Sequence, residues 1–399
     1  MNACIIAYTF YEIDYRVRRY AESLVERGDH VDVISLRRED QESEGILNGV
    51  NIYRIQKRPY NEKSLWDYVL RIVTFFAKAS IILFFRHLKR NYKLIHVHNV
   101  PDFLVFIGLI PKLLGAKTIL DIHDILPEFF CQKFKRGLDT TLAKLLLFVE
   151  KISVRFGDHV IVANDLWREK IIVRDKVPSA ACTTLLNYPN LEFFKNQRSK
   201  QDRLKNGQFV IIYPGTLSYH HGLDVLIRAL SIVKQKIPEV KLKVYVRSSN
   251  LEYFDFIRRL VSDLNLNDNV EFFDPVITEK LMEIFSDAEI GVVSKRGGFF
   301  AEEALSSKIF DFMAAGVPIV SSKTKIDEYY FNDSMILFFE PENHNDLARY
   351  ILELHENREK REAMIEQGRQ FIAKNNWGIK KSEYLNLVDR LTHSVSRKA

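Results

Sequence analysis

The stretch from Glu303 to Ser322, EALSSKIFDFMAAGVPIVSS, joins a short helical pattern directly to a strand pattern. Ser306 or Ser307 is a good N-cap for the helix KIFDFMAAG, whose final glycine is suited to end it. The strand PIVSS follows at once, which is typical of parallel sheets covered by helices. The stretch therefore predicts one unit of an α/β fold, with Asp311 on the second turn of its helix.

The same alternation of strands and helices occurs twice along the chain. In the first half, apolar runs such as ACIIAYTF, HVDVISL, KLIHVHNV and KTILDIHD alternate with helical patterns such as RVRRYAESLVERG and FLVFIGLIPKLLG. A second series starts with QFVIIYPGT and HGLDVLIRALSIVKQ and ends with SMILFFE. The polar, charged stretch KNQRSKQDRLKNGQ, residues 195–208, lies between them and predicts an interdomain linker. We therefore expect two Rossmann-like domains, the first over 1–195 and the second from 196 onward.

Composition limits the classes of protein to consider. Of 399 residues, 47% are hydrophobic and 28% are charged, which is typical of a globular chain long enough for two domains. Cys4, Cys131 and Cys182 have no CxxC or Cys/His spacing, which favours buried thiols in a reducing compartment over disulfides or a zinc site. No basic residue precedes the first apolar run, so we expect a first β-strand there and not a signal peptide.

The basic excess lies entirely in the first half of the chain. Residues 1–195 carry 29 Lys and Arg against 23 Asp and Glu, whereas residues 196–399 carry 29 of each kind. The first half is therefore expected to meet an anionic partner, either a phospholipid surface or a phosphate-bearing substrate. Nucleic acid is not an expected partner, because no dense basic stripe with interleaved aromatic residues occurs.

The spacing of Glu303 and Asp311 suits a ligand with polar groups at both ends. Eight helical residues would span about 12 Å. Between the two acids lie the backbone N–H groups of the helix start, which favour phosphate, and Lys308 adds a positive charge near them. Carboxylates accept hydrogen bonds from vicinal hydroxyls. The pattern predicts a nucleotide sugar laid end to end, with the hexose at Glu303, the pyrophosphate at Ser306 and Ser307, and the ribose at Asp311.

This pair of acids also belongs to a pattern that resembles a known enzyme family. Glu303-x7-Asp311 followed by FMAAGVP resembles the E-x7-E signature of retaining glycosyltransferase family 4, although the second acid is one methylene shorter than the family's usual Glu. Five other segments support the resemblance: YEIDYRVRRYAESLVERGDHVDVIS, ILDIHDILPE, TTLLNYPN, YPGTLSYHHGLDVLIRAL and NNWGIKKSEYLNLV. It implies a group-1 enzyme of the bacterial polysaccharide branch, with the GT-B fold of two facing Rossmann-like domains. The acceptor would bind 1–195 and the donor 196–375, and a crossover helix over 376–399 would return to the first domain.

The resemblance implies a reaction as well as a fold. A sugar, hexosyl or N-acetylhexosaminyl, would move with retention from a nucleotide-diphosphate donor, UDP-linked in most of the family, to a glycan or lipid-linked acceptor in the cytoplasm. No Asp-x-Asp follows a strand, so neither a metal nor a cofactor is expected. Two alternatives stay open: a sugar-nucleotide epimerase of the same architecture, and a non-catalytic nucleotide-sugar-binding partner in an assembly complex.

Histidines at the ends of first-half strands are candidates for the reaction centre. By resemblance, His123 at the end of ILDIHD contacts the donor sugar or the reacting atoms, and with Glu303 it forms the predicted catalytic pair. Asp124 is expected either to cap a helix or to support the site. His96 and His98 alternate in LIHVHN and are expected to point to opposite faces of the sheet, without forming a metal pair with His123.

The loop after Gly215 departs from the family's pattern. Most members carry a basic pair there for the diphosphate, whereas this chain has Thr216 and His221, which stay candidates for donor contacts. A solvated turn and a diphosphate contact are both open for His221. The residues expected to supply the missing charge are Arg247, Lys295 and Arg296.

The most apolar stretch of the chain is LWDYVLRIVTFFAKASIILFF, residues 65–85. By length alone it would span a bilayer, but Asp67, Arg71 and Lys78 fall within about 40° of one another on a helical wheel. We therefore expect an amphipathic helix that packs either on the first sheet or against an anionic membrane. The basic residues beyond it favour the membrane and predict a peripheral enzyme on the inner face of the cell membrane. These residues are Arg86, Lys89, Arg90 and Lys93.

Overall fold

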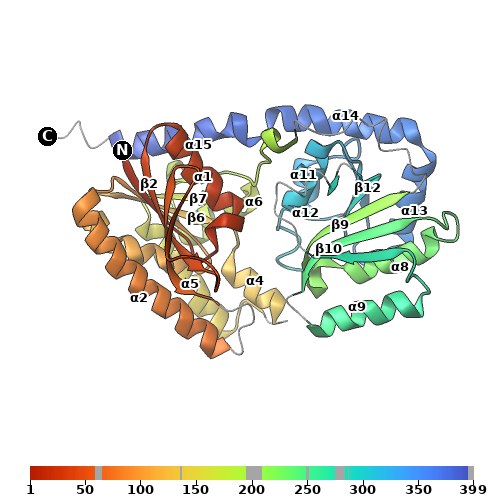
Figure 1. The fold of residues 1–399 in the computed structure, drawn as a ribbon, viewed down its shortest axis with the longest axis horizontal. Coiled ribbons are helices and arrows are strands. Elements are labelled where there is room, and N and C mark those ends of the chain that lie inside the picture. Colours follow the sequence, from red (N-terminus) through yellow and green to blue (C-terminus); the bar gives the residue numbers. More distant parts are fainter. Residues whose placement is uncertain are drawn as a thin grey trace. The chain divides into compact units, whose positions relative to one another are not determined.

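The computed structural model shows a chain of two structural units (Figure 1). Unit 1 comprises Met1–Asn187 and Lys380–Ala399, and unit 2 comprises Tyr188–Ile379. The predicted linker over 195–208 lies outside the residues that the structure describes. The described residues are 1–58, 65–134, 137–194, 209–248, 251–274, 284–285 and 287–393.

Unit 1 is built on a mostly parallel sheet. In its described residues the sheet has eight strands, in the order β3-β4-β2-β1-β5-β6-β7-β8. Paired strands are parallel except β3, which runs antiparallel to β4 at one edge. The predicted parallel sheet is confirmed, and the edge hairpin of β3 and β4 is an addition to it. The strands are β1 (Asn2–Ile6), β2 (His30–Arg37), β3 (Glu44–Leu47), β4 (Val50–Lys57), β5 (Leu94–His98), β6 (Lys117–Ile122), β7 (His159–Val162) and β8 (Cys182–Thr184).

Helices connect these strands, as the sequence pattern predicts. Asp14 caps the first α-helix, α1 (Tyr15–Glu26), by accepting a hydrogen bond from the Val17 backbone N–H at 3.2 Å. The apolar run FLVFIGLIPKLLG forms a 3-10 helix followed by a short α-helix. The helical elements are η1 (Tyr11–Ile13), α1 (Tyr15–Glu26), α2 (Leu65–Arg90), η2 (Asp102–Gly108), α3 (Leu109–Leu113), α4 (Leu126–Lys133), α5 (Thr141–Phe156), α6 (Asp165–Asp175) and η3 (Ser179–Ala181).

The last helix of the chain, α15 (Trp377–His393), completes unit 1. The Tyr384 hydroxyl lies 3.0 Å from His96 Nδ1 on β5, and the Tyr384 ring contacts Tyr20 of α1. Arg27 pairs with Asp389 at the end of the same helix. Residues from Lys380 onward therefore belong to unit 1.

Helix α2 has two apolar stripes on opposite sides. Ile72, Phe75, Ala79 and Leu83 are buried in the core of unit 1, where they share a cluster with residues of β1, β2 and β5. A second stripe lies about 180° away at 100° per residue and is between 51% and 66% exposed. The residues of this exposed stripe are Leu70, Val73, Ile81, Phe85 and Leu88.

The expectation that α2 packs on the first sheet is thus confirmed for one stripe only. By length and composition the stretch Asp67–Arg90 could also cross a membrane. Because Ile72 and Phe75 belong to the core of unit 1, we describe α2 as part of the folded unit. Arg71 and Asp67, predicted to share one side of the helix, form an ion pair there with Nε and Oδ1 3.0 Å apart.

Unit 2 is built on a parallel sheet. Its described part has six strands in the order β11-β10-β9-β12-β13-β14, and all paired strands run parallel. The second predicted series of strands is confirmed. The strands are β9 (Val210–Leu217), β10 (Lys241–Ser248), β11 (Val270–Phe273), β12 (Ile290–Val293), β13 (Ile319–Ser322) and β14 (Ile336–Phe339).

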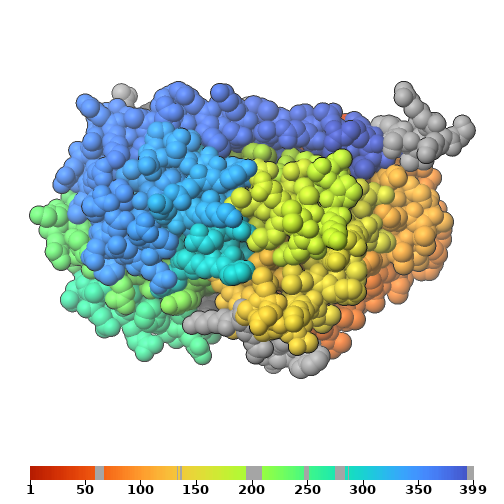
Figure 2. Space-filling view, turned by 180° about the vertical axis from the view of Figure 1, so that it is seen from behind, coloured from red at the N-terminus to blue at the C-terminus, as the bar shows by residue number. Residues whose placement is uncertain are grey.

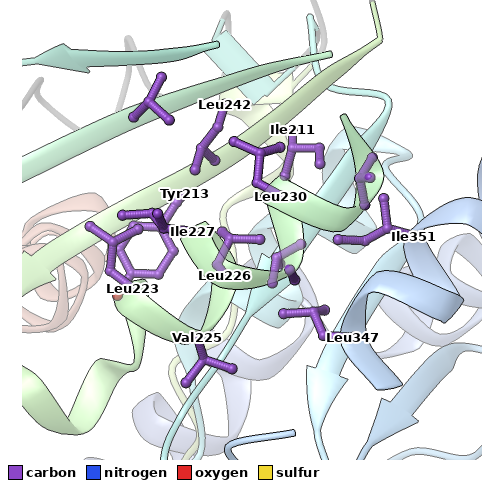
Figure 3. Packing of buried hydrophobic residues seen from close by; sticks show 14 of the residues in the cluster. Ile211, Tyr213, Leu223, Val225, Leu226, Ile227, Leu230, Leu242, Leu347 and Ile351 are labelled. Atoms are coloured by element: carbon purple, nitrogen blue, oxygen red, sulfur yellow. The ribbon is translucent and has the colours of Figure 1, made fainter. Parts of the chain in front are cut away.

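The core of unit 2 joins the sheet to the helices that flank it (Figure 3). Leu226 and Leu230 of α8 (Leu223–Val233) face Ile211 of β9. Leu347 and Ile351 of α13 (His344–Glu356) extend the same cluster. The helical elements are η4 (Leu191–Phe194), η6 (Tyr219–His221), α8 (Leu223–Val233), α9 (Leu251–Asp263), α11 (Ser307–Ala315), α12 (Lys325–Tyr330), α13 (His344–Glu356) and α14 (Arg358–Lys374). All three cysteines of the chain are buried free thiols, as predicted.

Candidate functional site

The start of α11 is left open to an anion. Ser306 is the N-cap, and its side chain makes no capping hydrogen bond in the described structure. Gly316 adopts the left-handed conformation directly after the last helical residue, with φ of 65°. The predicted helix limits are therefore confirmed. The Ile309 backbone N–H donates to the Ser306 carbonyl at 3.2 Å. Since the Ser306 side chain does not cap the first turn, the backbone N–H groups of Ser307 and Lys308 are the ones suited to another acceptor, such as phosphate.

Glu303 lies in the loop before α11, as predicted. Its side chain is 13% exposed, and its Oε1 is 3.6 Å from Nζ of Lys325, which is mostly exposed. Because the lysine is exposed to water, the pair is screened and adds about 0–1 kcal/mol to stability. The neighbouring Glu302 has a local structural role, because its carboxylate accepts the Lys325 backbone N–H.

Lys308 on the first turn of α11 packs against the end of β9. A Cβ at position 215 would lie 2.7 Å from Cε and 3.1 Å from Nζ of Lys308, so any larger residue there would require the end of the lysine side chain to move. Gly215 also has a φ of 148°, which favours glycine. The structure therefore brings Gly215 and Lys308 together, and the lysine Nζ lies beside the glycine backbone at the carboxyl end of β9.

The titratable groups around Lys308 influence one another. Burial raises the pKa of Asp311 to about 7, although Lys308 acts to lower it. Burial lowers the pKa of His221 to about 3, and Lys308, His220 and Lys295 act in the same direction. At neutral pH the His221 ring is therefore neutral and can offer a hydrogen bond but no charge. Burial also lowers the pKa of Lys308, which Asp311 partly offsets.

Arg296 holds the loop after β9 in shape. Its backbone N–H and Nε donate to the carbonyls of His220 and Tyr219, and its guanidinium stacks on the Tyr219 ring at 4.0 Å. The same guanidinium pairs with Asp224 of α8 and with Glu342. Its charge is thus balanced by two carboxylates, and its predicted contact with phosphate stays a prediction.

Lys295 also makes an ion pair and a hydrogen bond within unit 2. Its Nζ lies 2.9 Å from Oδ2 of the buried Asp327 and donates to the Ala304 carbonyl at 3.0 Å. Thr216 is exposed at the end of β9, where it pairs in register with Arg247 of β10. The Arg247 side chain lies outside the described part of the chain, so its predicted role stays a prediction.

In unit 1, His123 follows β6 and is positioned by Asn99. The Asn99 Oδ1 accepts the His123 backbone N–H at 3.0 Å, and its Nδ2 donates to the Asp124 carbonyl at 2.7 Å and to Asp102 Oδ1 at 2.8 Å. The His123 Nδ1 is buried and has no hydrogen-bond partner among the described residues. The N-cap of α4 is Ile125, so Asp124 does not cap that helix.

A buried cluster lies beneath His123. Arg16 donates through Nε and Nη2 to both carboxylate oxygens of Asp121, at 2.8 and 2.6 Å. Burial alone would raise the pKa of Asp121, but Arg16 and His98 hold it well below its usual value. His96 and His98 stack with their ring centroids 4.6 Å apart. Our expectation that they point to opposite faces was wrong, because residues two apart on a strand share a face.

Three ligand atoms in this cluster are close enough for a metal ion. The donor atoms of His96, His98 and Asp121 lie within 4.8 Å of one another and are buried. However, the Arg16 guanidinium already occupies both oxygens of Asp121, so a cation would have to displace a buried ion pair. We therefore assign the cluster to the positioning of β5, β6 and α1.

Two family models match this chain, one in each half. A model described as "Glycosyl transferase 4-like domain" matches residues 13–187, and one described as "Glycosyl transferases group 1" matches residues 194–371. The chain belongs to the group-1 glycosyltransferases. An uncharacterized glycosyltransferase of Methanocaldococcus jannaschii is 25% identical to it over 312 residues, which cover 76% of this chain and 74% of that relative. The predicted family is confirmed.

Solved structures agree on the fold of this glycosyltransferase. Sucrose-phosphate synthase from Thermosynechococcus elongatus matches with a TM-score of 0.76 and 19% identity, over 99% of this chain and 100% of that chain. HepE of Anabaena in complex with UDP matches with a TM-score of 0.71 and 16% identity, over 97% and 99%. At these identities the likeness shows the fold alone. The glycosyltransferase has the predicted GT-B fold, two α/β domains with parallel sheets.

Sequence reasoning missed the residues that hold the candidate site residues of this glycosyltransferase in place. Tyr213 and Ser294 donate to the His221 carbonyl at 3.1 and 3.2 Å, and Ser294 also donates to the Gly222 carbonyl. Asn99 supports His123 across two strand ends. For Ser294 and Asn99 the available signal was positional, because each lies just beyond the carboxyl end of a parallel strand, whereas Tyr213 lies in the middle of β9.

Proposed function

We propose that this glycosyltransferase moves a hexosyl or N-acetylhexosaminyl group from a UDP-linked donor to an acceptor hydroxyl, with retention at the anomeric carbon. The observation that carries the proposal is the start of α11, which has no side-chain cap and has Lys308 packed on Gly215, with Glu303 before it and Asp311 after it in sequence. The Anabaena HepE structures with UDP and with UDP-glucose support the choice of donor.

We assign each of these groups in unit 2 to one part of the nucleotide-sugar donor. The diphosphate accepts hydrogen bonds from the first N–H groups of α11 and from Lys308. This lysine supplies the positive charge that the loop after Gly215 lacks in this chain. The ribose hydroxyls donate to Asp311, and the sugar hydroxyls donate to Glu303. The neutral His221 offers a hydrogen bond in the same region. The charge that develops on the leaving diphosphate is met by these groups without a metal ion.

The chemistry proposed is a front-face substitution. The acceptor oxygen forms a bond to the anomeric carbon while the bond from that carbon to the diphosphate oxygen breaks, and the departing phosphate oxygen takes the acceptor's proton. We assign no carboxylate as a nucleophile, so the rate depends on positioning and on stabilising the leaving group. In unit 1, His123 Nδ1 has no hydrogen-bond partner among the described residues, and a sugar hydroxyl would supply one.

The acceptor is proposed to be a lipid-linked or polysaccharide precursor, and the enzyme to be cytoplasmic and peripheral to the membrane. The exposed stripe of α2 is the main support, and α3 packs beside α2 with Leu113 exposed. Helix α5 adds Leu145 and Phe148 to the exposed apolar side chains of unit 1. Figure 2 shows the amber and yellow segments that contain α4 and α5 at the surface of unit 1. We refer to the exposed apolar residues of α2, α3 and α5 as the apolar surface.

Labelled UDP-sugars test the reaction. Purified protein should release UDP and pass the label to acceptor lipid or glycan extracted from cells. Release of an altered sugar would instead identify an epimerase, and saturable binding with an intact donor would identify a binding partner. Either result would overturn the proposed transfer.

Flotation with liposomes tests the membrane contact. Wild-type protein should float with anionic vesicles at low salt, and the double variant Leu70→Ser with Leu88→Ser should float less because it removes apolar area from the exposed stripe. The substitution set leaves Arg86 intact, since this residue is bound to Asp32 and Tyr53 within the fold. Wild-type protein that stays soluble with both anionic and neutral vesicles would end the membrane proposal.

A further inference from the structure

A groove of about 990 Å³ lies in unit 1 between the second half of α2 and the edge strands β3 and β4. Seven of its lining side chains are Lys or Arg, and Glu44 is the single carboxylate among them. No candidate residue for sugar transfer lines this groove. We refer to it as the basic groove.

Two of the cations in the basic groove serve the fold. Arg54 pairs with Glu12, and Arg86 pairs with the buried Asp32 and stacks on the ring of Tyr53. The other five cations make no ion pair with any described residue, and they surround a common space. These five are Arg37, Lys57, Lys78, Lys89 and Arg90.

The local sequence explains the concentration of charge. Residues 51–93 contain ten Lys and Arg but only two acids, Glu62 and Asp67, and Asp67 is paired with Arg71. Bringing like charges together opposes folding, and a bound anion relieves that repulsion. Phosphate groups are well suited to such a cluster because several lysines and arginines can donate to their oxygens at once.

One wall of the basic groove is apolar. Ile81 and Phe85 line it, are each 58% exposed, and belong to the exposed stripe of α2. The groove therefore opens onto the apolar surface that we propose to face the membrane. A ligand with a phosphate and a hydrocarbon chain would satisfy both walls, whereas a polar phosphate compound would leave the apolar wall in water.

We propose that the basic groove binds the phosphate headgroup of an anionic lipid, with the lipid chain leaving along Ile81 and Phe85. The proposal rests on the membrane contact proposed above and adds a defined headgroup site to it. A headgroup in the groove would hold unit 1 on the membrane by a specific contact and not by surface charge alone.

Matched variants distinguish a site from general attraction. Lys78→Gln with Lys89→Gln removes two charges from the groove, and Lys144→Gln with Lys151→Gln removes two from α5, outside it. Dioctanoyl phosphatidic acid, below its micelle concentration, serves as the calorimetric probe for the full-length protein. The groove pair should weaken saturable binding about 30-fold, and the α5 pair by less than about threefold. Equal losses in the two pairs would overturn the proposal.

Two further measurements separate the sources of phosphate. Inorganic pyrophosphate should compete poorly with the lipid probe, and Phe85→Ser should weaken the lipid alone. Competition by pyrophosphate as strong as that of the lipid would mean a free-phosphate site and would overturn the lipid assignment. Vesicles with oleate, which carries a charge but no phosphate, matched in surface charge to vesicles with phosphatidic acid, should bind less protein, and equal binding would reduce the contact to charge.

The donor site is tested independently on the same preparation. Thermal stabilisation of the wild-type protein by UDP reports unit 2 and requires no lipid. Stabilisation by UDP with no binding of the lipid probe would reject the basic groove and leave the transfer proposal standing. Lipid binding without stabilisation by UDP would reject the transfer proposal and support the lipid site in the basic groove.

Discussion

Basic side chains do different work in the two units of this glycosyltransferase. In unit 2, Arg296 and Lys295 lie seven and eight residues before Glu303 in sequence, yet both are buried and paired with carboxylates of the same unit. In the basic groove of unit 1, Lys57, Lys78 and Lys89 are exposed and make no ion pair among the described residues. A cation near a predicted phosphate site is therefore not in itself a phosphate ligand.

The difference follows from the cost of burying charge. A buried arginine must be compensated by carboxylates, and once compensated it fixes backbone geometry and no longer attracts an anion. Exposed lysines remain solvated and can exchange water for a ligand. Lys308 lies between these limits, because it is partly buried and its nearest described acid, Asp311, has a pKa raised by burial to about 7.

The largest expected effect is the loss of stability on Arg296→Gln. The substitution leaves Asp224 buried without its counter-charge, which should cost about 3–5 kcal/mol in the free energy of unfolding. Denaturant unfolding of the full chain measures it, and Lys89→Gln in the basic groove is the control, with a change within about 0.5 kcal/mol. A stable Arg296→Gln protein that has lost UDP binding would make Arg296 a phosphate ligand and break the comparison.

Glu303→Ala should reduce the rate of transfer by about 30- to 1,000-fold, since a charged hydrogen bond to the sugar in the transition state contributes about 2–4 kcal/mol. The fold should be unaffected, because Glu303 lies in a loop and not in a helix or strand. Glu302→Ala is the matched control and should keep most of the activity. More than half of wild-type activity in Glu303→Ala would remove this residue from the site.

Lys308→Gln tests whether this lysine of unit 2, unlike Arg296 and Lys295, contacts phosphate. Loss of a charged hydrogen bond should weaken UDP binding by about 10- to 100-fold, corresponding to about 1.5–3 kcal/mol. Uridine, which lacks the diphosphate, should bind the variant and the wild type equally. Lys325→Gln, near Glu303 but exposed, is the control. Equal weakening of UDP and uridine would mean that Lys308 shapes the site without contacting phosphate.

The raised pKa of Asp311 predicts that donor binding depends on pH. Its raised pKa of about 7 means that the carboxylate form needed to accept ribose hydroxyls is lost as the pH falls below 7. UDP affinity should therefore drop about tenfold between pH 8 and pH 6, and Asp311→Asn should flatten this profile. The same shift makes the ionised Asp311 destabilising in the free protein, a cost that is relieved as the pH falls from 7 towards the unfolded value. A wild-type profile parallel to that of Asp311→Asn would exclude the assignment.

The smallest effect is expected from EDTA. Helix N–H groups and Lys308 are proposed to meet the diphosphate charge, and Arg16 already occupies the carboxylate of the buried histidine cluster. UDP release should therefore be unchanged by EDTA. Complete loss of activity that Mn²⁺ or Mg²⁺ restores would contradict the donor scheme and direct attention to a metal.

Periodicity was a good guide to the fold because buried parallel strands and their helices leave strong local patterns. The runs KTILDIHD and QFVIIYPGT became β6 and β9, and the helix before Gly316 has the predicted limits. The antiparallel edge strand β3 escaped notice because its short EGIL run carries little apolar signal.

The candidate site was harder to foresee, since pairing depends on residues distant in sequence. Arg296 meets Asp224 across 72 positions, and no local pattern announces that contact. The stacking of His96 on His98 was predictable from strand geometry, and our opposite expectation was an error of reasoning. The two stripes of α2 could be counted from the sequence, but only packing shows which one is buried.

The hydrogen bond between Tyr384 and His96 has a consequence for biosynthesis. Most of unit 1 precedes unit 2 in the chain, but unit 1 receives Tyr384 only after every residue of unit 2 has been made. A ribosome-bound chain can therefore complete the core of unit 2 first, although domains usually fold in order from the N-terminus. Until α15 emerges, Tyr20 and the buried His96 lack the ring that covers them.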